Sequence, residues 1–337
     1  MTKPQLAIVA ACRPFLRAKK PKGSTRRSAR SVCMLLAFMV TFLVSMSGCD
    51  GAGPEPFEEE VIVESYQIAG EPVAPVRLSR SIPLDETYSP GDAAVRGATV
   101  EIDALADDGS VHTTISMVEA PDSAGFYLPA GRLDTTGAAP PVPVVEPLQT
   151  YRLRVETAAG ASLRSTTTVP DTFSIVSVSQ DTATYLADEE VGIRITASQT
   201  PGRDQAFYIF STESLDPVEE NLVPLVGDFL EEDENTVIDD VVITSSPILN
   251  EAGYTANPDG TFTLRLPWVL VAFFGPNRTR INVLDANMYD FVRSQTAQQG
   301  GGGFTPGAIP NVIETVDGGG GLFGSMASVR YDVYVEE

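Results

Sequence analysis

Short segments in which apolar and polar residues alternate recur along most of this chain, and they constrain its fold more than any other feature. In residues 151–156, three apolar residues alternate with two arginines and a glutamate. A period of two places successive side chains on opposite faces of a β-strand, so one face of this segment is apolar and the other is polar. Because turn residues separate such segments and helical periodicity is rare, the sequence predicts a mainly all-β protein.

The alternating segments fall into two groups, and 337 residues are enough for two domains. Residues 61–170 contain seven predicted strands with turn residues between them, which is typical of an immunoglobulin-like or transthyretin-like β-sandwich. Residues 171–337 contain further short strands and predict a second β-rich domain. The predicted strands are Val61–Ala69, Pro75–Ser79, Ala98–Ala104, His112–Val118, Gly125–Leu128, Tyr151–Glu156, Ser162–Val169, Phe173–Gln180, Val191–Ala197, Ala206–Ser211, Val237–Thr244, Thr261–Leu266, Val269–Phe274, Arg280–Leu284 and Ala327–Val335.

One helix is predicted in the second domain, near residues 286–298. Met288 and Phe291 recur there at helical spacing, and Asp285 precedes the segment as a capping residue. Two runs of four glycines, at 300–303 and 318–321, predict tight or mobile turns. We expect the helix and the 300–303 loop to form the functional surface, because exposed loops carry function more often than strands.

The apolar run Leu266–Phe274 contains the single tryptophan, Trp268. A continuous apolar run of this length favours a buried sandwich strand over an exposed platform for a carbohydrate or peptide.

The first 48 residues differ from the rest of the chain and predict a secretory signal peptide. Residues 1–30 are basic, residues 31–47 are apolar and uncharged, and Gly48 precedes Cys49. Signal peptides have this order of regions, although the apolar run is also close to the length of an uncleaved membrane-spanning helix. The motif Met46-Ser47-Gly48-Cys49 resembles a bacterial lipobox, and it predicts that Cys49 becomes the lipidated N-terminus.

Residues 49–60 combine glycine, proline and acidic residues without periodicity, and they predict a flexible acidic tether. A solvated linker is one interpretation. The other is a resemblance to the surface-export signals of Bacteroidetes-type lipoproteins, which would place the body outside the cell. The remaining cysteines, Cys12 and Cys33, precede Cys49, so no disulfide is expected in the body.

From Cys49 onward the chain is strongly acidic and contains no lysine. Nine of its 23 basic residues precede Cys49, which leaves 14 arginines against 45 acidic residues. This charge repels phosphate backbones, so we expect no nucleic-acid partner. The composition is halophilic-like, in that it resembles proteins adapted to high salt, although an arginine-biased genome would also account for the missing lysine.

Several motifs, taken in their order along the chain, resemble the domain-of-unknown-function 4249 family. The resemblance covers residues 61–337 and implies a Bacteroidetes-type outer-membrane lipoprotein of a kind often found with TonB-dependent receptors. No activity is established for the family, so it implies no catalytic residues. The motifs are Val61–Pro72, Val76–Ser81, Gly97–Val100, Gly125–Tyr127, Thr150–Leu153, Thr167–Pro170 and Gly319–Ser325.

No catalytic motif is recognisable in the sequence. The single histidine, His112, lies in a predicted strand, and there is no G-x-S-x-G segment that would indicate a serine nucleophile. The absence of lysine after residue 48 excludes a P-loop in the body. The sequence therefore predicts a protein without enzymatic activity and without a cofactor beyond its lipid.

Acidic residues are densest between residues 231 and 240, where they offer the oxygen ligands that Ca²⁺ prefers. Their spacing does not match a calcium-binding loop of known type, so a solvated acidic loop is the favoured interpretation. A carboxylate pair of the glycosidase kind also stays open. The weak calcium candidates are Glu231, Glu232, Asp233, Asp239 and Asp240.

Together these features predict a lipid-anchored outer-membrane protein that faces the cell exterior. We expect it to bind a ligand or partner as an accessory to a TonB-dependent receptor. Two alternatives stay open, namely a structural or adhesive cell-surface lipoprotein and a carboxylate-dependent hydrolase.

Overall fold

The structure is a computed structural model that describes residues 57–337 except 84, 135–140, 189, 233–236, 250–253 and 299–314. The predicted signal peptide, Cys49 and most of the predicted tether lie outside the described residues, as do glycines 300–303. Residues 58–337 group into one unit.

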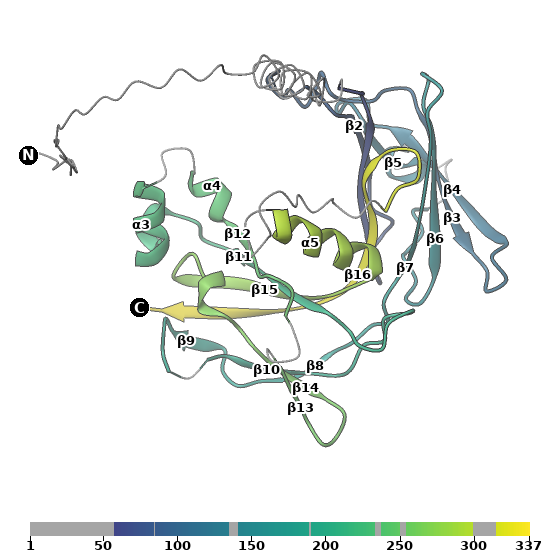
Figure 1. The fold of residues 1–337 in the computed structure, drawn as a ribbon. Coiled ribbons are helices and arrows are strands. Elements are labelled where there is room, and N and C mark those ends of the chain that lie inside the picture. The colour runs from purple at the N-terminus through teal and green to yellow at the C-terminus, as the bar shows by residue number, and fades with distance from the viewer. Residues whose placement is uncertain are drawn as a thin grey trace, which may run out of the picture. The chain divides into compact units, whose positions relative to one another are not determined.

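Twelve strands within the described residues form one mixed sheet (Figure 1). Its members are β1 (Val61–Ile68), β2 (Val76–Arg80), β3 (Thr99–Leu105), β4 (Val111–Glu119), β5 (Phe126–Pro129), β6 (Thr150–Glu156), β7 (Ser162–Thr168), β9 (Thr182–Thr184), β11 (Tyr208–Ser214), β12 (Ile243–Ser245), β15 (Gly275–Leu284) and β16 (Gly320–Glu336). Neighbouring strands follow the order β12-β11-β15-β16-β1-β2-β5-β4-β3-β6-β7, and β9 pairs with β16.

A second sheet has four strands in the order β13-β14-β10-β8, and the helical segments are short. The prediction of a mainly β fold is therefore confirmed. The second sheet consists of β8 (Ile175–Val178), β10 (Gly192–Ile195), β13 (Tyr254–Ala256) and β14 (Phe262–Arg265). The helical segments are α2 (Ala130–Leu133), α3 (Pro224–Glu232), α4 (Ile238–Val241), α5 (Ala286–Gln298) and the 3₁₀ turns η2 (Glu219–Asn221) and η4 (Trp268–Leu270).

The first hydrophobic core lies between strands from the N-terminal half of the long sheet. In β6 the apolar side chains at every second position are buried, as their alternation predicts. The sheet curls so that one face of β1 to β7 encloses this cluster, which gives a β-sandwich core (Figure 1). Among its buried side chains are Val63, Leu78, Ile102, Tyr127, Leu153, Leu163 and Phe323.

The second hydrophobic core lies between the two sheets. The inner faces of β11, β15 and the end of β16 pack against β10 and β14 of the small sheet, so this part is also two-layered. Its buried side chains include Ile193, Ile195, Tyr208, Phe210, Leu264, Ile281, Val283, Val333 and Val335.

The long strand β16 belongs to both cores. Residues 320–326 pair in parallel with residues 62–68 of β1, and the rest of the strand pairs antiparallel with β15. It contributes Phe323 to the first cluster and Val333 to the second. The predicted division into domains 61–170 and 171–337 stays a prediction.

The glycines at 318–321 were predicted to form a turn, but two of them belong to a strand. Gly320 and Gly321 lie within β16, and the backbone of Gly321 has φ +98°. A Cβ at Gly321 would lie 2.1 Å from the carbonyl oxygen of Val63. Glycine is therefore required for β16 to approach β1.

Helix α5 has the predicted bounds, and the Asp285 carboxylate caps it by accepting a hydrogen bond of 2.8 Å from the Met288 N–H. The prediction of a strand over Val269–Phe274 is wrong, because a 3₁₀ turn begins at Trp268 and Val269 is 66% exposed.

The predicted strand Val237–Thr244 is wrong over most of its length, because helix α4 spans Ile238–Val241 and β12 begins only at Ile243. Helix α3 was not predicted. None of the helices in the described part of the chain is long and apolar enough to cross a bilayer.

Candidate functional site

A hollow opens on the outer face of the sheet where the hairpin of β1 and β2 separates. These strands pair only between residues 61–64 and 77–80. The chain then turns at Gly70, and Pro72 and Pro75 in the returning segment have no N–H to donate to a strand ladder. The hollow between these segments has a volume of about 430 Å³, and it is named the β1–β2 cleft below.

Arg77 lines the β1–β2 cleft, and three neighbours hold its side chain. Its Nη1 donates a hydrogen bond of 2.6 Å to Glu64 Oε2, and its Nη2 donates one of 2.7 Å to the Tyr88 hydroxyl. The guanidinium carbon lies 5.7 Å from the ring centroid of Phe126, within the range of a cation–π contact. Because Glu64, Arg77 and Phe126 are partners in register on β1, β2 and β5, the sheet itself aligns them.

Aromatic rings in and beside the β1–β2 cleft remain exposed. Tyr66 is 51% exposed, Tyr88 is 49% exposed and Phe126 is 38% exposed. Tyr66 lies on the same outward face of β1 as Glu64, two residues away, and it lines the cleft together with Phe126. Exposed rings grouped beside a few fixed polar groups are typical of binding sites for ligands.

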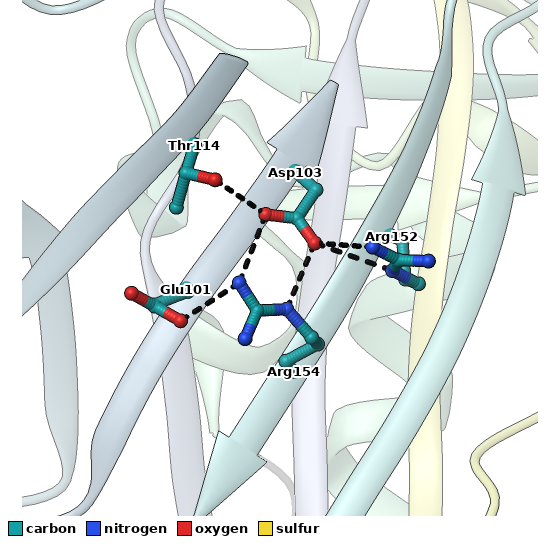
Figure 2. A network of polar contacts seen from close by, with 5 residues as sticks. All are labelled: Glu101, Asp103, Thr114, Arg152 and Arg154. Atoms are coloured by element: carbon teal, nitrogen blue, oxygen red, sulfur yellow. Dashed lines mark hydrogen bonds and ion pairs between the residues drawn. The ribbon is translucent and has the colours of Figure 1, made fainter. Parts of the chain in front are cut away.

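A network of charged residues lies further along the same face of the sheet, on β3, β4 and β6 (Figure 2). The Asp103 side chain is 0% exposed and accepts hydrogen bonds of 2.8 Å from Arg152 and Arg154 and of 2.7 Å from Thr114. Glu101 lies 2.8 Å from Arg154. Burial alone would raise the pKa of Asp103, but the hydrogen bonds from Arg154, Arg152 and Thr114 outweigh it and hold that pKa well below its usual range.

This charged network joins strands rather than presenting a reactive group. Both oxygens of the Asp103 carboxylate are engaged by donors on the two neighbouring strands. A carboxylate that is ionised and enclosed in this way is not poised to transfer protons near neutral pH. The network therefore stabilises the β4-β3-β6 part of the sheet.

A second buried carboxyl group lies where β7, α5 and β16 meet. Asp285 is 2% exposed and accepts a hydrogen bond of 2.5 Å from the Thr167 hydroxyl, which in turn lies 2.6 Å from the Ser325 hydroxyl. Burial raises the pKa of Asp285 above its usual value, although the hydrogen bonds from Thr167 and from the Met288 N–H oppose the shift. This group connects three elements and caps α5.

The structure does not bring the described calcium candidates together into a site. Within the described residues no group of three or more ligand-type side chains could hold a metal ion. Glu231 and Glu232 end α3 with side chains that are not described, and Asp233 lies outside the described residues. Asp239 and Asp240 are exposed in the first turn of α4, where Asp240 accepts a hydrogen bond of 3.0 Å from the Val237 N–H. The calcium prediction stays a prediction.

The other predicted positions do not form a site in the described part of the chain. Cys49 lies outside the described residues, and His112 is exposed on β4. Helix α5, which we expected to carry function, packs Met288 against Leu322 and Met326 of β16. The β1–β2 cleft was missed, although the outward position of Tyr66 in an alternating strand was a usable signal.

The family model for a domain of unknown function, DUF4249, matches residues 52–332, which is most of the chain. The chain belongs to the DUF4249 family. The resemblance inferred from the ordered motifs is thereby confirmed as to family, and DUF4249 has no assigned function to transfer. No curated protein matches this DUF4249 chain.

Solved structures similar to this DUF4249 chain come from large proteins. A tetra-tandem repeat in the extending region of a large adhesion protein has 10% identity and a TM-score of 0.21, and the match covers 83% of this chain and 49% of that one. Salmonella alpha-2-macroglobulin reacted with methylamine has 10% identity and a TM-score of 0.21, covering 85% of this chain and 15% of that one. Escherichia coli alpha-2-macroglobulin activated by porcine elastase has 11% identity and a TM-score of 0.20, covering 82% and 23%. The chain thus spans half or less of each of these chains.

Proposed function

We propose that this DUF4249 protein is a lipid-anchored protein of the outer membrane, exposed at the cell surface, that binds a ligand through the β1–β2 cleft. It acts as a non-enzymatic accessory to a TonB-dependent receptor. The observation that carries the binding role is the pair of exposed rings of Tyr88 and Phe126 in contact with the fixed guanidinium of Arg77, together with the exposed ring of Tyr66 that lines the same cleft.

The membrane location rests on the sequence. The motif Met46–Cys49 supports a lipid anchor, and the acidic segment that follows supports export to the surface. Two or more acyl chains on Cys49 would give stable anchorage, whereas a single chain gives only marginal binding. The association with a TonB-dependent receptor rests on the resemblance to DUF4249 lipoproteins.

The test is a pull-down of the tagged, lipidated protein from outer membranes at native salt, together with protease treatment of intact cells. We expect a TonB-dependent receptor to be recovered and the C-terminal tag to be removed by the protease. The matched control is Cys49→Ser, which cannot carry the acyl chains. Recovery of the protein alone, with its tag protected, would contradict the proposal and favour the structural or adhesive alternative.

A further inference from the structure

We propose that the β1–β2 cleft binds a neutral sugar ring, so that the ligand of this protein is an uncharged glycan. This inference rests on the proposed binding function and names its ligand class. In the cleft, Tyr66 and Phe126 provide apolar ring surface, while Glu64 and Arg77 provide planar hydrogen-bonding groups beside it.

The chemistry of a pyranose fits these two kinds of side chain. A pyranose has an apolar face of C–H groups and a rim of hydroxyls, so it requires a flat apolar surface with hydrogen-bonding groups at its edge. Tyr66 and Glu64 lie on one face of β1, and the ion pair with Arg77 fixes the carboxylate of Glu64 before a ligand arrives. A fixed planar carboxylate or guanidinium can engage two adjacent hydroxyls at once.

The charges of the β1–β2 cleft disfavour an ionic ligand. Its acidic residues are Glu64 and Glu71, and its basic residue is Arg77, whose charge Glu64 neutralises at 2.6 Å. An anionic ligand would therefore meet an excess of carboxylates in a body that is already acidic. A cationic group near Phe126 would be repelled by the positive charge of Arg77, whose guanidinium carbon lies 5.7 Å from the ring centroid, whereas a neutral ring would not.

The backbone around the β1–β2 cleft disfavours a peptide that binds by strand addition. Such a peptide needs an open strand edge. The edge of β1 beyond Glu64 faces the chain's own residues, because Ser65 Oγ donates a hydrogen bond of 2.9 Å to the Pro75 carbonyl and the Ala74 N–H donates one of 2.9 Å to Gln67 Oε1. A ligand recognised by ring stacking does not need that edge.

The experiment is a titration of the full lipidated chain with neutral hexasaccharides of glucose, mannose and xylose, followed by calorimetry and by saturation-transfer NMR. The protein is held in a polyoxyethylene detergent, because a glycoside detergent would itself offer sugar rings. An oligogalacturonate of the same length and a proline-rich decapeptide complete the panel. We expect at least one neutral oligosaccharide to bind and the other two ligands not to bind.

Substitutions in the β1–β2 cleft test whether the oligosaccharide binds there. Tyr66→Ala and Phe126→Ala should each weaken binding by about tenfold or more, and Glu64→Gln should weaken it less. Tyr334→Ala is the matched control, because Tyr334 is 50% exposed at the far end of β16. This variant should bind the oligosaccharide as the wild type does. Thermal unfolding of each variant is measured as a control, and we expect the loss of an exposed ring to leave the fold intact.

Each outcome decides the inference. Failure of all neutral oligosaccharides to bind would overturn it, as would binding that Tyr66→Ala and Phe126→Ala leave unchanged. Preferential binding of the oligogalacturonate or of the decapeptide would replace the neutral sugar by an acidic sugar or a peptide. Recovery of the receptor in the pull-down without sugar binding would overturn this inference alone, whereas sugar binding without the receptor would overturn only the accessory role.

Discussion

Two buried aspartates show how the surroundings of one residue type set its charge. Two guanidinium groups and a hydroxyl stabilise the ionised form of Asp103, so its pKa falls. Asp285 is also buried, but its partners are a hydroxyl and backbone N–H groups rather than cations, so its pKa rises. The two residues therefore change the stability of the fold in opposite directions as the pH changes.

Asp103→Asn should lower the free energy of unfolding at pH 7 by about 2 kcal/mol, because it removes charge-assisted hydrogen bonds from two arginines. The folded-state pKa of Asp103 is lowered, so its contribution is present above the unfolded-state pKa of about 3.9 and is lost as the pH falls below it. Urea unfolding at several pH values measures this. The exposed Asp122→Asn is the control, and an equal loss at pH 7 and pH 2.5 would contradict the prediction.

Asp285→Asn should give the opposite dependence. The folded-state pKa of Asp285 is raised, so the folded protein binds the proton more tightly and the contribution of Asp285 declines as the pH rises above about 3.9. Asparagine keeps a carbonyl oxygen for the Met288 N–H, so helix α5 should keep its cap. The difference in unfolding free energy between wild type and variant should fall from pH 4 towards pH 7. A difference that stays constant over this range would show that Asp285 titrates normally.

At the scale of elements, the close approach of β1 and β16 depends on a glycine. Gly321→Ala should lower the free energy of unfolding by about 3 kcal/mol, because the residue has φ +98° and a methyl group would meet the Val63 carbonyl. Gly227→Ala is the matched control in α3, where nothing lies within 4 Å of the added Cβ. That variant should gain about 0.5–1 kcal/mol through helix propensity. Thermal unfolding of the two variants gives the comparison, and equal effects would refute the steric argument.

Elements specified by neighbouring residues could be predicted, and elements specified by distant pairing could not. The alternation in β6 and the helical spacing that follows Asp285 are patterns among neighbouring residues, and both predictions are confirmed. The start of β16 has glycines in place of an alternating pattern, and it is a strand because β1 pairs with it. The run before Phe274 is apolar whether it forms a strand or a turn, so its pattern does not determine its conformation.

The candidate site could not be predicted for the same reason. Glu64, Arg77 and Phe126 belong to three strands, and only the strand register brings them together. These three residues lie far apart in the sequence and form no recognisable motif. What the sequence did offer was an aromatic residue, Tyr66, at an outward position of a strand.

At the scale of the whole molecule, the shared strand predicts one unfolding transition. Phe323→Ala removes a side chain from the first cluster, whereas the single tryptophan, Trp268, packs against the second. We expect the denaturant midpoint reported by Trp268 fluorescence to fall in this variant, with a loss of about 3–5 kcal/mol. An exposed control, Tyr66→Ala, should leave the midpoint unchanged. A midpoint that is insensitive to Phe323→Ala would show that residues 61–170 and 171–337 unfold independently.

The parallel pairing of β1 with β16 also orders the events of biosynthesis. Strand β1 is the first strand of the described unit to be synthesised, and its neighbour β16 follows every other strand of that unit. The central part of the long sheet therefore cannot close during translation, and contacts so distant in sequence form slowly. In the export proposed above, this delay would keep the polypeptide extended enough to cross a membrane until β16 has been synthesised.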